Sequence, residues 1–182
     1  MAFGLDLTNV DRYIASYGAY LVRQAKIRLK SKKATGSLYN SLGYQLDKSL
    51  GEDRHIIELK MLSEKYGKFV EQGVSGTKGK RTYINIKGKR VVSKFKRKKQ
   101  PPPQSIFKWI KAKRIKGRDK KTGRFITDKA TAFLIGRGIK RKGTPGLSFY
   151  SQPMSATLKY FKKNLEKNFK ADVVKNLTNI GL

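Results

Sequence analysis

The sequence predicts an α+β protein: a small twisted antiparallel sheet flanked by an N-terminal helix, short middle helices and a long C-terminal helix, with a basic β-hairpin insertion. Three observations predict this arrangement. Apolar residues recur at three- and four-residue steps near both ends of the chain, which is the helical period. They alternate at two-residue steps within residues 42–61, which is the strand period. Basic residues crowd the middle, where 25 Lys and Arg but only 2 acidic residues stand between Lys78 and Lys142. We therefore expect a single domain over residues 1–182, with a basic insertion at about 76–100 and a basic loop at about 114–126.

The N-terminal helix is expected over residues 9–33, with Asn9 as its cap, because one apolar stripe runs along it. The stripe consists of Val10, Ile14, Tyr17, Leu21, Ala25 and Leu29. Thr35 and Gly36 end the helix and form a turn, in which Gly36 supplies a backbone conformation that other residues resist. A hairpin with one buried face follows over residues 42–61, with its turn at 51–53.

Two shorter elements are expected next. Residues 63–72 predict a short helix that Ser63 caps and that Gly73 ends in a left-handed conformation. A second hairpin is expected from residues 81–87 and 90–96, around the turn at Gly88. Its alternation is weak and its ends are charged.

The three prolines at 101–103 predict an extended spacer, after which Ser105 is expected to cap a helix through Lys113. Thr127 or Asp128 is expected to cap another helix, which ends at Gly143. The residues expected to face inward are Ile106, Trp109 and Ile110 in the first of these helices and Ala130, Phe133, Leu134 and Gly138 in the second.

The last helix has the most regular periodicity in the sequence, and Pro153 suits its first turn. Its apolar stripe consists of Met154, Leu158, Phe161, Leu165, Phe169, Val173 and Leu177. We interpret the stripe as a core-packing face rather than a membrane-binding face, since a chain of 182 residues must bury much apolar surface.

The charge of the middle region predicts an anionic partner. The chain has a formal net charge of +31, whereas a small domain needs only about 2 to 8 for solubility. Nucleic acid, an acidic protein surface and anionic lipid all meet the requirement. Candidate contacts with DNA or an acidic partner are Arg81, Lys87, Lys89, Arg90, Lys94, Lys96, Arg97, Lys98, Lys99, Arg114, Lys116, Arg118, Lys120, Lys121 and Arg124.

Alternatives remain open for both parts of this region. The cluster at 94–99 binds DNA phosphates, docks on an acidic protein surface, or is a solvated charge run. Phosphate contacts would be independent of base sequence and would weaken with salt. Gly117 and Gly123 in the loop at 114–126 predict either a mobile loop that orders only against a partner or an ordinary flexible surface loop.

Several kinds of chemistry have no support in the sequence. The chain has no Cys, so it has no disulfide and no thiolate metal site. His55 is the one histidine and is best explained as a strand residue. There is no Ser-His-carboxylate pattern, no paired carboxylates and no Walker motif, so we predict no enzyme activity and no cofactor. No apolar run approaches the roughly 20 residues that span a bilayer, and the first residues lack a signal-peptide pattern, so we expect a cytoplasmic protein without a membrane partner.

Four short segments carry a resemblance to a known family. In order they are Thr35-Gly36-Ser37-Leu38-Tyr39-Asn40-Ser41-Leu42, Tyr66-Gly67-Lys68-Phe69-Val70-Glu71-Gln72-Gly73, Ile106-Phe107-Lys108-Trp109-Ile110 and Gly143-Thr144-Pro145-Gly146-Leu147-Ser148-Phe149-Tyr150. With the helices and strands between them, they resemble the tail-completion, or head-tail joining, proteins of tailed bacteriophages. The second segment departs from the usual family pattern at Gly67, where the family usually has Ala.

The resemblance implies a virion structural protein at the neck, where copies form a homo-oligomeric ring that joins portal or adaptor proteins to the tail. It implies assembly in the cytoplasm of the host bacterium, packaged double-stranded DNA as a further candidate partner, and no enzyme activity. Candidate subunit-interface residues are Tyr66, Phe69, Glu71 and Gly73, and the structural turns are at Thr35, Gly36, Gly143, Pro145 and Gly146.

A nonspecific nucleic-acid-binding protein is the competing prediction, because composition alone favours it. The placement of most aromatic residues on predicted buried stripes argues against a stacking surface for single strands. A hydrolase or nuclease is a third class, and it lacks clustered carboxylates for metal ions.

Overall fold

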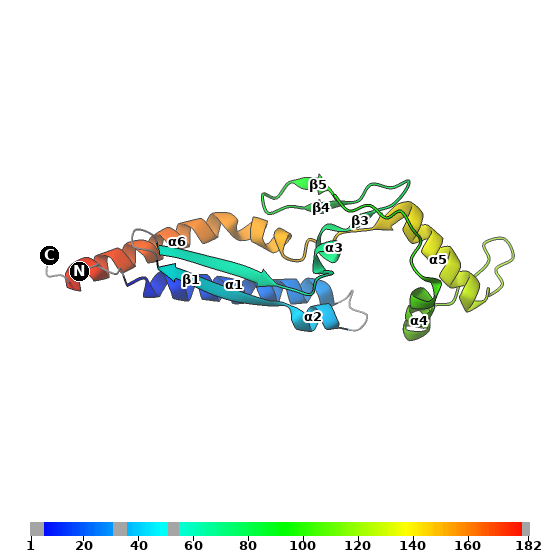
Figure 1. The fold of residues 1–182 in the computed structure, drawn as a ribbon, viewed down its shortest axis with the longest axis horizontal. Helices are drawn as coiled ribbons and strands as arrows, with labels where there is room; N and C mark the ends of the chain where they lie inside the picture. Colours follow the sequence, from blue (N-terminus) through cyan, green and yellow to red (C-terminus); the bar gives the residue numbers. More distant parts are fainter. Residues whose placement is uncertain (1–5, 31–35, 51–54, 180–182) are drawn as a thin grey trace. The chain divides into compact units, whose positions relative to one another are not determined.

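The computed structural model describes residues 6–30, 36–50 and 55–179 and confirms the α+β class. In chain order the elements are α1 (Thr8–Lys30), α2 (Ser37–Ser41), β1 (Gly43–Leu50), β2 (His55–Leu62), α3 (Gly67–Gln72), β3 (Val74–Ser75), β4 (Thr82–Ile84), β5 (Arg90–Val92), α4 (Pro103–Lys113), α5 (Asp128–Lys142), β6 (Gly143–Thr144) and α6 (Ser151–Asn179). Figure 1 labels most of them along the chain. The expected turns at Thr35 and at 51–53 lie outside the described residues.

The chain divides into two compact units. Unit 1 comprises Met1–Gly67, Asn85–Gly88 and Phe149–Leu182, and unit 2 comprises Lys68–Ile84 and Lys89–Ser148. The described strands form three separate two-stranded antiparallel sheets, which pair β1 with β2, β3 with β6, and β4 with β5. Both predicted hairpins are therefore present, although β4 and β5 are shorter than expected.

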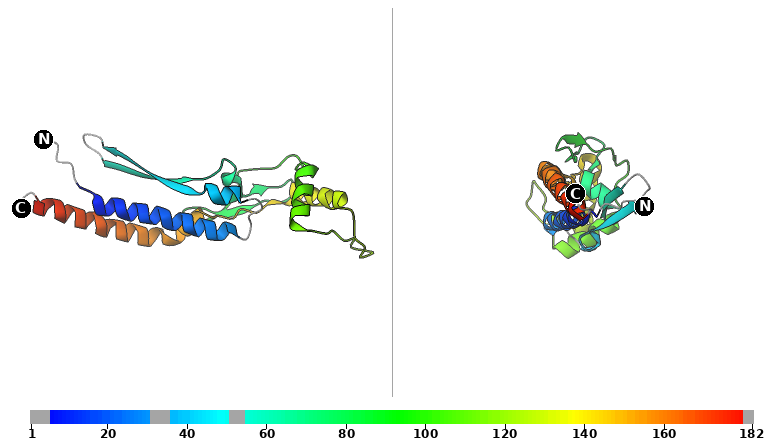
Figure 2. Two further views of the ribbon diagram at one scale, coloured as in Figure 1. Left: turned by 90° about the horizontal axis from the view of Figure 1, so that it is seen from below. Right: turned by 90° about the vertical axis from the view of Figure 1, so that its left-hand side faces the viewer.

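In unit 1, helix α1 lies between α6 and the β1–β2 hairpin (Figure 2, left). The stripe that was predicted for α1 is buried along its full length. Gly18 is where the hairpin comes closest, since a Cβ there would meet the side chains of Tyr44 and Leu59 at under 3.0 Å. A glycine that weakens an isolated helix thus lets this helix pack tightly against the hairpin.

The start of α1 is held by α6 and not by Asn9. Asp172 of α6 is fully buried and accepts hydrogen bonds from the backbone N–H groups of Asn9 (3.1 Å) and Val10 (2.9 Å) and from the side chain of Asn9 (2.7 Å). The expectation that Asn9 caps the helix is wrong, because Asn9 lies inside α1 and donates to a carboxylate distant in sequence. Asp172 does what a local N-cap does elsewhere: it satisfies backbone donors that have no partner within the helix.

The apolar stripe of α6 covers α1 only in part. Phe161 stacks on Tyr13 of α1, with ring centroids 5.6 Å apart, and packs at a tilt against Tyr17, with centroids 4.4 Å apart. Phe169 and Leu177, however, each keep 46% of their surface exposed. The core-packing interpretation therefore holds at Phe161 and not at these two residues.

Unit 2 is built around the packing of α4 on α5. Ile106 and Ile110 of α4 are buried against Ala132 of α5. Helix α4 begins at Pro103, with Pro102 as its N-cap and no side-chain cap bond, so Ser105 is not the cap that was predicted. Trp109 is 39% exposed and does not share the buried face with the two isoleucines.

Helix α5 has the predicted ends but a different buried face. Thr127 caps it by accepting from the backbone N–H of Ala130, and Gly143 ends it at a φ of 75°. The buried residues are Thr131, Ala132 and Gly136. Ala130 is exposed, as are Phe133 and Leu134 (51 and 52%), so the expectation that they face inward is wrong. The small residues Ala132 and Gly136, four apart, present the face that α4 can approach closely.

Candidate anion-binding surface

A loop after β3 wraps the C-terminal end of α5. The backbone N–H of Thr77 donates to the carbonyl of Lys140 (2.9 Å), and those of Lys78 and Gly79 donate to the carbonyl of Arg141 (2.9 and 3.1 Å). Carbonyl groups in the last turn of a helix have no partner within the helix, so the loop supplies the donors they lack. The loop and the helix end therefore hold each other in place.

Arg81 extends this arrangement with its side chain. Its Nε donates to the carbonyl of Lys142 (2.7 Å), and a second guanidinium nitrogen donates to the carbonyl of Gly143 (3.3 Å). Arg81 is thus fixed by the helix end, and a cation is also favourable there because the helix C-terminus carries partial negative charge.

Glycine makes this close approach of backbone to backbone possible. A Cβ at Gly76 would lie under 3.0 Å from the carbonyl oxygen of Arg141, and one at Gly143 equally close to that of Val74. Gly143 also has a φ in the left-handed region. Any other residue at either position would push the loop away from the helix end.

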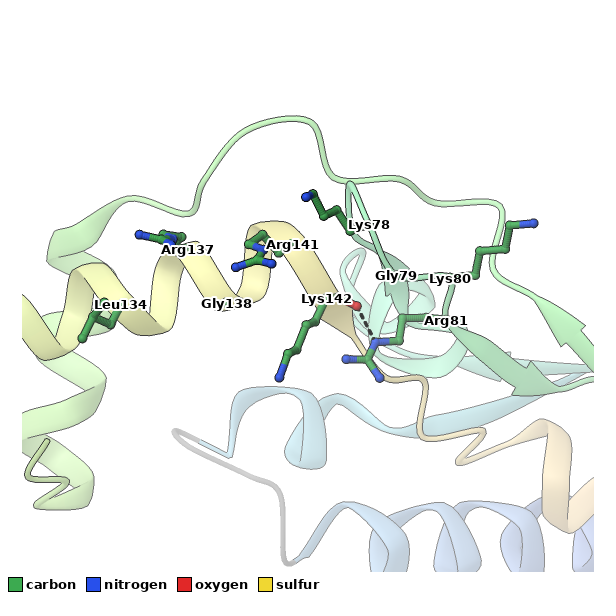
Figure 3. Close-up of a pocket in the computed structure, with 9 residues that line it drawn as sticks. All are labelled: Lys78, Gly79, Lys80, Arg81, Leu134, Arg137, Gly138, Arg141 and Lys142. Atoms are coloured by element: carbon green, nitrogen blue, oxygen red, sulfur yellow. Dashed lines mark hydrogen bonds between the residues drawn. The ribbon is translucent and has the colours of Figure 1, made fainter. Parts of the chain in front are cut away.

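Between the loop and α5 lies an open hollow of about 540 Å³ (Figure 3). Its cationic lining residues are Lys78, Lys80, Arg81, Arg137, Arg141 and Lys142, and its other lining residues are Gly79, Leu134 and Gly138. Apart from the half-buried Arg81, all these cationic residues are exposed. Among the residues that line the hollow there is no carboxylate, so the structure supplies no counter-ion there.

The surrounding unit has few acids to offset this charge. Unit 2 contains 25 Lys and Arg but only three acidic residues, Glu71, Asp119 and Asp128. Asp128 pairs with Lys116 at 3.3 Å. Asp119 accepts hydrogen bonds within its own loop, and the backbone N–H of Thr122 is the main cause of the lowering of its pKa below the ordinary value.

The basic residues predicted from sequence lie mostly outside the hollow. Arg81 is the predicted contact that lines it. Arg90 lies in β5, Lys89 precedes it, and Lys87 is in the turn that belongs to unit 1. Lys94, Lys96, Lys98 and Lys99 are exposed on the segment after β5. Arg97 is half-buried there, and its backbone N–H donates to the carbonyl of Ser75 (2.8 Å).

The basic loop at 114–126 has internal structure. Arg118 and Phe125 form a β-bridge, and the carboxylate of Asp119 accepts from the backbone N–H groups of Lys121 (2.9 Å) and Thr122 (2.8 Å). The loop therefore has hydrogen bonds of its own, and its ordering against a partner stays a prediction. Arg114, Lys116, Lys120, Lys121 and Arg124 are exposed around it.

Sequence reasoning did not single out Lys78, Lys80, Arg137, Arg141 and Lys142 as contact residues. The loop and α5 lie far apart in the chain, and hydrogen bonds to the carbonyls at the end of α5 bring their cations together. A signal was present in Gly76, Gly79 and Gly143, since clustered glycines mark a close approach of backbone.

Two of the resemblance segments meet in one joint within unit 2. The carbonyls of Val70 and Glu71 at the end of α3 accept from the backbone N–H groups of Leu147 (2.9 Å) and Ser148 (3.0 Å). Gly73 has a φ of 73°, as predicted. A Cβ at Gly73 would lie under 3.0 Å from backbone atoms of Pro145 and Gly146, and one at Gly146 equally close to Gln72. We call this arrangement the glycine joint.

The candidate interface residues of that segment differ in exposure. Tyr66 and Phe69 are 42 and 40% exposed, and the ring of Phe69 also contacts that of Phe95 at 4.6 Å. Glu71 is half-buried and has partners within the chain. Gly73 is buried in the glycine joint, so its role is internal.

Helix α3 begins at Gly67, so residues 63–66 and the predicted Ser63 cap lie outside it. Gly36, at a φ of 85°, forms the predicted turn before α2.

Several aromatic side chains of unit 2 are exposed, and they include Trp109 and Phe133, which were expected to face inward. Phe125 is 64% exposed beneath the guanidinium of Arg118, 4.2 Å from its ring centroid. Phe133 and Trp109 are 51 and 39% exposed. None of these three lines the hollow.

No group of His, Asp and Glu within the described residues could hold a metal ion, and no helix among them is long and apolar enough to cross a membrane. Comparison of the chain with family models, with curated proteins and with solved structures gave no match.

Proposed function

We propose that this chain is a structural protein of a tailed-bacteriophage virion, located at the head-tail interface. In this proposal it is not an enzyme. Copies form a ring that joins portal or adaptor proteins to the tail, and the basic surface of unit 2 makes the electrostatic contact with DNA or with an acidic neighbour.

The observation that carries the proposal is the glycine joint. The resemblance to head-tail joining proteins was based on separate segments of sequence, each weak alone. Two of them, Tyr66–Gly73 and Gly143–Tyr150, supply the two sides of one hydrogen-bonded contact through Val70, Glu71, Leu147 and Ser148. Segments that match by chance have no reason to meet, so their meeting supports the resemblance.

Features of unit 1 support subunit contacts. Each strand of the β1–β2 hairpin has one edge without a partner strand among the described residues, and such edges are available for pairing with another chain. Ile56 and Leu62 on β2 are 54 and 44% exposed. An assembled ring would cover such apolar side chains.

A nonspecific nucleic-acid-binding protein is the second candidate, and the exposed aromatic residues favour it. Phe125 is exposed beneath the guanidinium of Arg118, and Phe133 is exposed on α5. Exposed aromatic rings together with cationic side chains are what proteins use to bind single-stranded nucleic acid, through stacking and backbone contact. DNA binding in solution would agree with both candidates, so it does not discriminate between them.

The test is to count this protein in purified virions by quantitative mass spectrometry, relative to the portal protein, after nuclease treatment and a high-salt wash. A fixed, low ratio that survives the wash is the expected result. Loss of the protein in the wash would refute the neck location and favour the nucleic-acid-binding candidate.

Glu71→Ala tests the interface role directly. We expect it to impair particle assembly while the purified chain stays folded, because the substitution keeps the backbone carbonyl of residue 71 that accepts from Ser148. Normal particle yield with this variant would remove Glu71 from the interface.

A further inference from the structure

We propose that the hollow beside α5 binds the phosphate backbone of a nucleic-acid duplex, without reading base sequence. The inference concerns one site and is carried by the groups that line it. That the duplex is DNA rests on the proposed function, which places packaged DNA nearby.

The first argument is that the hollow offers hydrogen-bond donors and few free acceptors. Lys and Arg side chains donate only. The backbone carbonyls of Lys140, Arg141, Lys142 and Gly143 already accept from the wrapping loop or from Arg81. A phosphodiester backbone presents acceptors only, so it suits such a surface.

An acidic peptide suits the hollow less well. Besides its carboxylates, each of its residues except proline presents a backbone N–H that needs an acceptor. The lining residues include no Asp, Glu, Asn or Gln, so no side chain of the hollow supplies one.

The second argument is the arrangement of the charges. Arg137 and Arg141 are four residues apart on α5, so they lie about 6 Å apart along the helix. Gly138 stands beside them, and a Cβ there would meet nothing within 4 Å, so a ligand can approach the helix backbone between the two arginines. Lys78 and Lys80 come from the wrapping loop, and Figure 3 shows the side chain of Lys78 on the side of Arg141 and that of Lys80 extended away from α5.

The helix dipole does not explain the whole cluster. Arg141 and Lys142 lie in the last turn of α5, where cations are favourable in any helix. Arg137 lies before that turn, and Lys78 and Lys80 belong to a loop. Their mutual repulsion has no carboxylate to offset it within the hollow, so a bound polyanion would relieve it.

The third argument concerns the form of the nucleic acid. Proteins that hold single strands stack the bases on aromatic side chains. The one large apolar residue of the hollow is Leu134, and no aromatic residue lines it. The site can therefore contact a backbone whose bases are already paired.

The test is the affinity of the full chain for a short fluorescein-labelled DNA duplex, measured by anisotropy from about 0.05 to 0.5 M salt. The variant is Arg137→Gln with Arg141→Gln. Its matched control is Lys163→Gln with Lys167→Gln on α6, which removes the same charge from exposed positions with the same spacing. Circular dichroism shows that each variant is folded.

Each phosphate contact contributes a slope of about −0.9 in log K against log salt concentration, which is about an eightfold change in affinity between 1 M and 0.1 M salt. Removing two contacts should therefore weaken binding about 60-fold at 0.1 M salt and make the slope shallower by about 1.8. The control variant should change both the affinity and the salt slope by only a small fraction of these amounts.

Equal losses in the variant and the control would overturn the proposal, because binding would then follow total charge and not this hollow. Lys78→Gln with Lys80→Gln in the wrapping loop provides a second variant, and it should reproduce the loss. If polyglutamate binding showed the loss and duplex binding did not, the hollow would be assigned to an acidic protein and the proposal would be refuted.

The two proposals can fail separately. Absence from washed virions with a normal result in the duplex assay would refute the neck location and leave the phosphate site. A fixed count in virions, together with duplex binding that does not depend on Arg137 and Arg141, would refute the phosphate site and leave the neck location.

Discussion

Asp172→Ala should loosen the start of α1, although the two residues it contacts lie at the other end of the sequence. The carboxylate of Asp172 is fully buried and accepts from two backbone N–H groups, those of Asn9 and Val10. It also accepts from the side chain of Asn9. Alanine removes all three acceptor contacts and leaves the backbone donors without a partner.

The size of the effect follows from those contacts. Losing an N-cap typically costs about 1 kcal/mol, and leaving a buried donor unsatisfied costs about 1 to 3 kcal/mol. With two backbone donors affected, we expect local stability to fall by about 3 kcal/mol. Since about 1.4 kcal/mol is a factor of ten, amide exchange in the first turns of α1 should become about 100-fold faster.

Hydrogen-exchange mass spectrometry on peptides from α1 measures this directly, because it reports on unit 1 separately from unit 2. Asp172→Asn should show a smaller effect, since it keeps one acceptor oxygen. Glu166→Gln serves as a control: it alters an exposed pair with Lys170 on the same helix and should leave exchange in α1 unchanged. Unchanged exchange in Asp172→Ala would refute the capping role.

Three further outcomes are expected for unit 2, where Trp109 is the chain's only tryptophan and its fluorescence can follow thermal unfolding. Gly73→Ala should destabilise the unit by at least about 2 kcal/mol, because it places a Cβ against backbone at a positive φ; an unchanged melting temperature would disprove this. Gly138→Ala should stabilise it by up to about 1 kcal/mol, because the Cβ meets nothing and alanine favours a helix; a clear destabilisation would contradict it. Hydrogen bonding, first from Thr122, lowers the pKa of Asp119, so its contribution to loop stability is complete above the ordinary carboxyl range and is lost as the pH falls through the lowered pKa. Proteolysis of the loop should accordingly speed up at acid pH, and Asp119→Ala should remove that pH dependence; a pH dependence that survives in the variant would refute the assignment.

The periodic parts of the fold could be predicted from the sequence. The stripe of α1 and the β1–β2 hairpin were predictable because their apolar residues recur at a regular helical or strand period. Gly73 and Gly143 were predictable as helix ends because few other residues adopt a positive φ.

Which face of α5 is buried could not be predicted in the same way, because apolar residues occur all around the helix. Phe133 and Leu134 are as apolar as Ile135, and only the approach of α4 decides which side is covered. The small residues Ala132 and Gly136 determine which side α4 covers, because they allow Ile106 to come close.

The hollow and the cap by Asp172 were unpredictable for a shared reason. Both depend on backbone groups at a helix end that are satisfied by residues distant in sequence. Periodicity describes which face of a helix is buried, and it carries no information about what meets the ends.

The order in which the chain is synthesised gives the Asp172 contact a further consequence. Asn9 and Asp172 are 163 residues apart, so at about 5 to 20 residues per second a ribosome needs about 8 to 30 s to pass from one to the other. All of unit 2 is made in that interval. Unit 2 can therefore fold while unit 1 is still incomplete, and the first helix to be made is among the last to receive its cap.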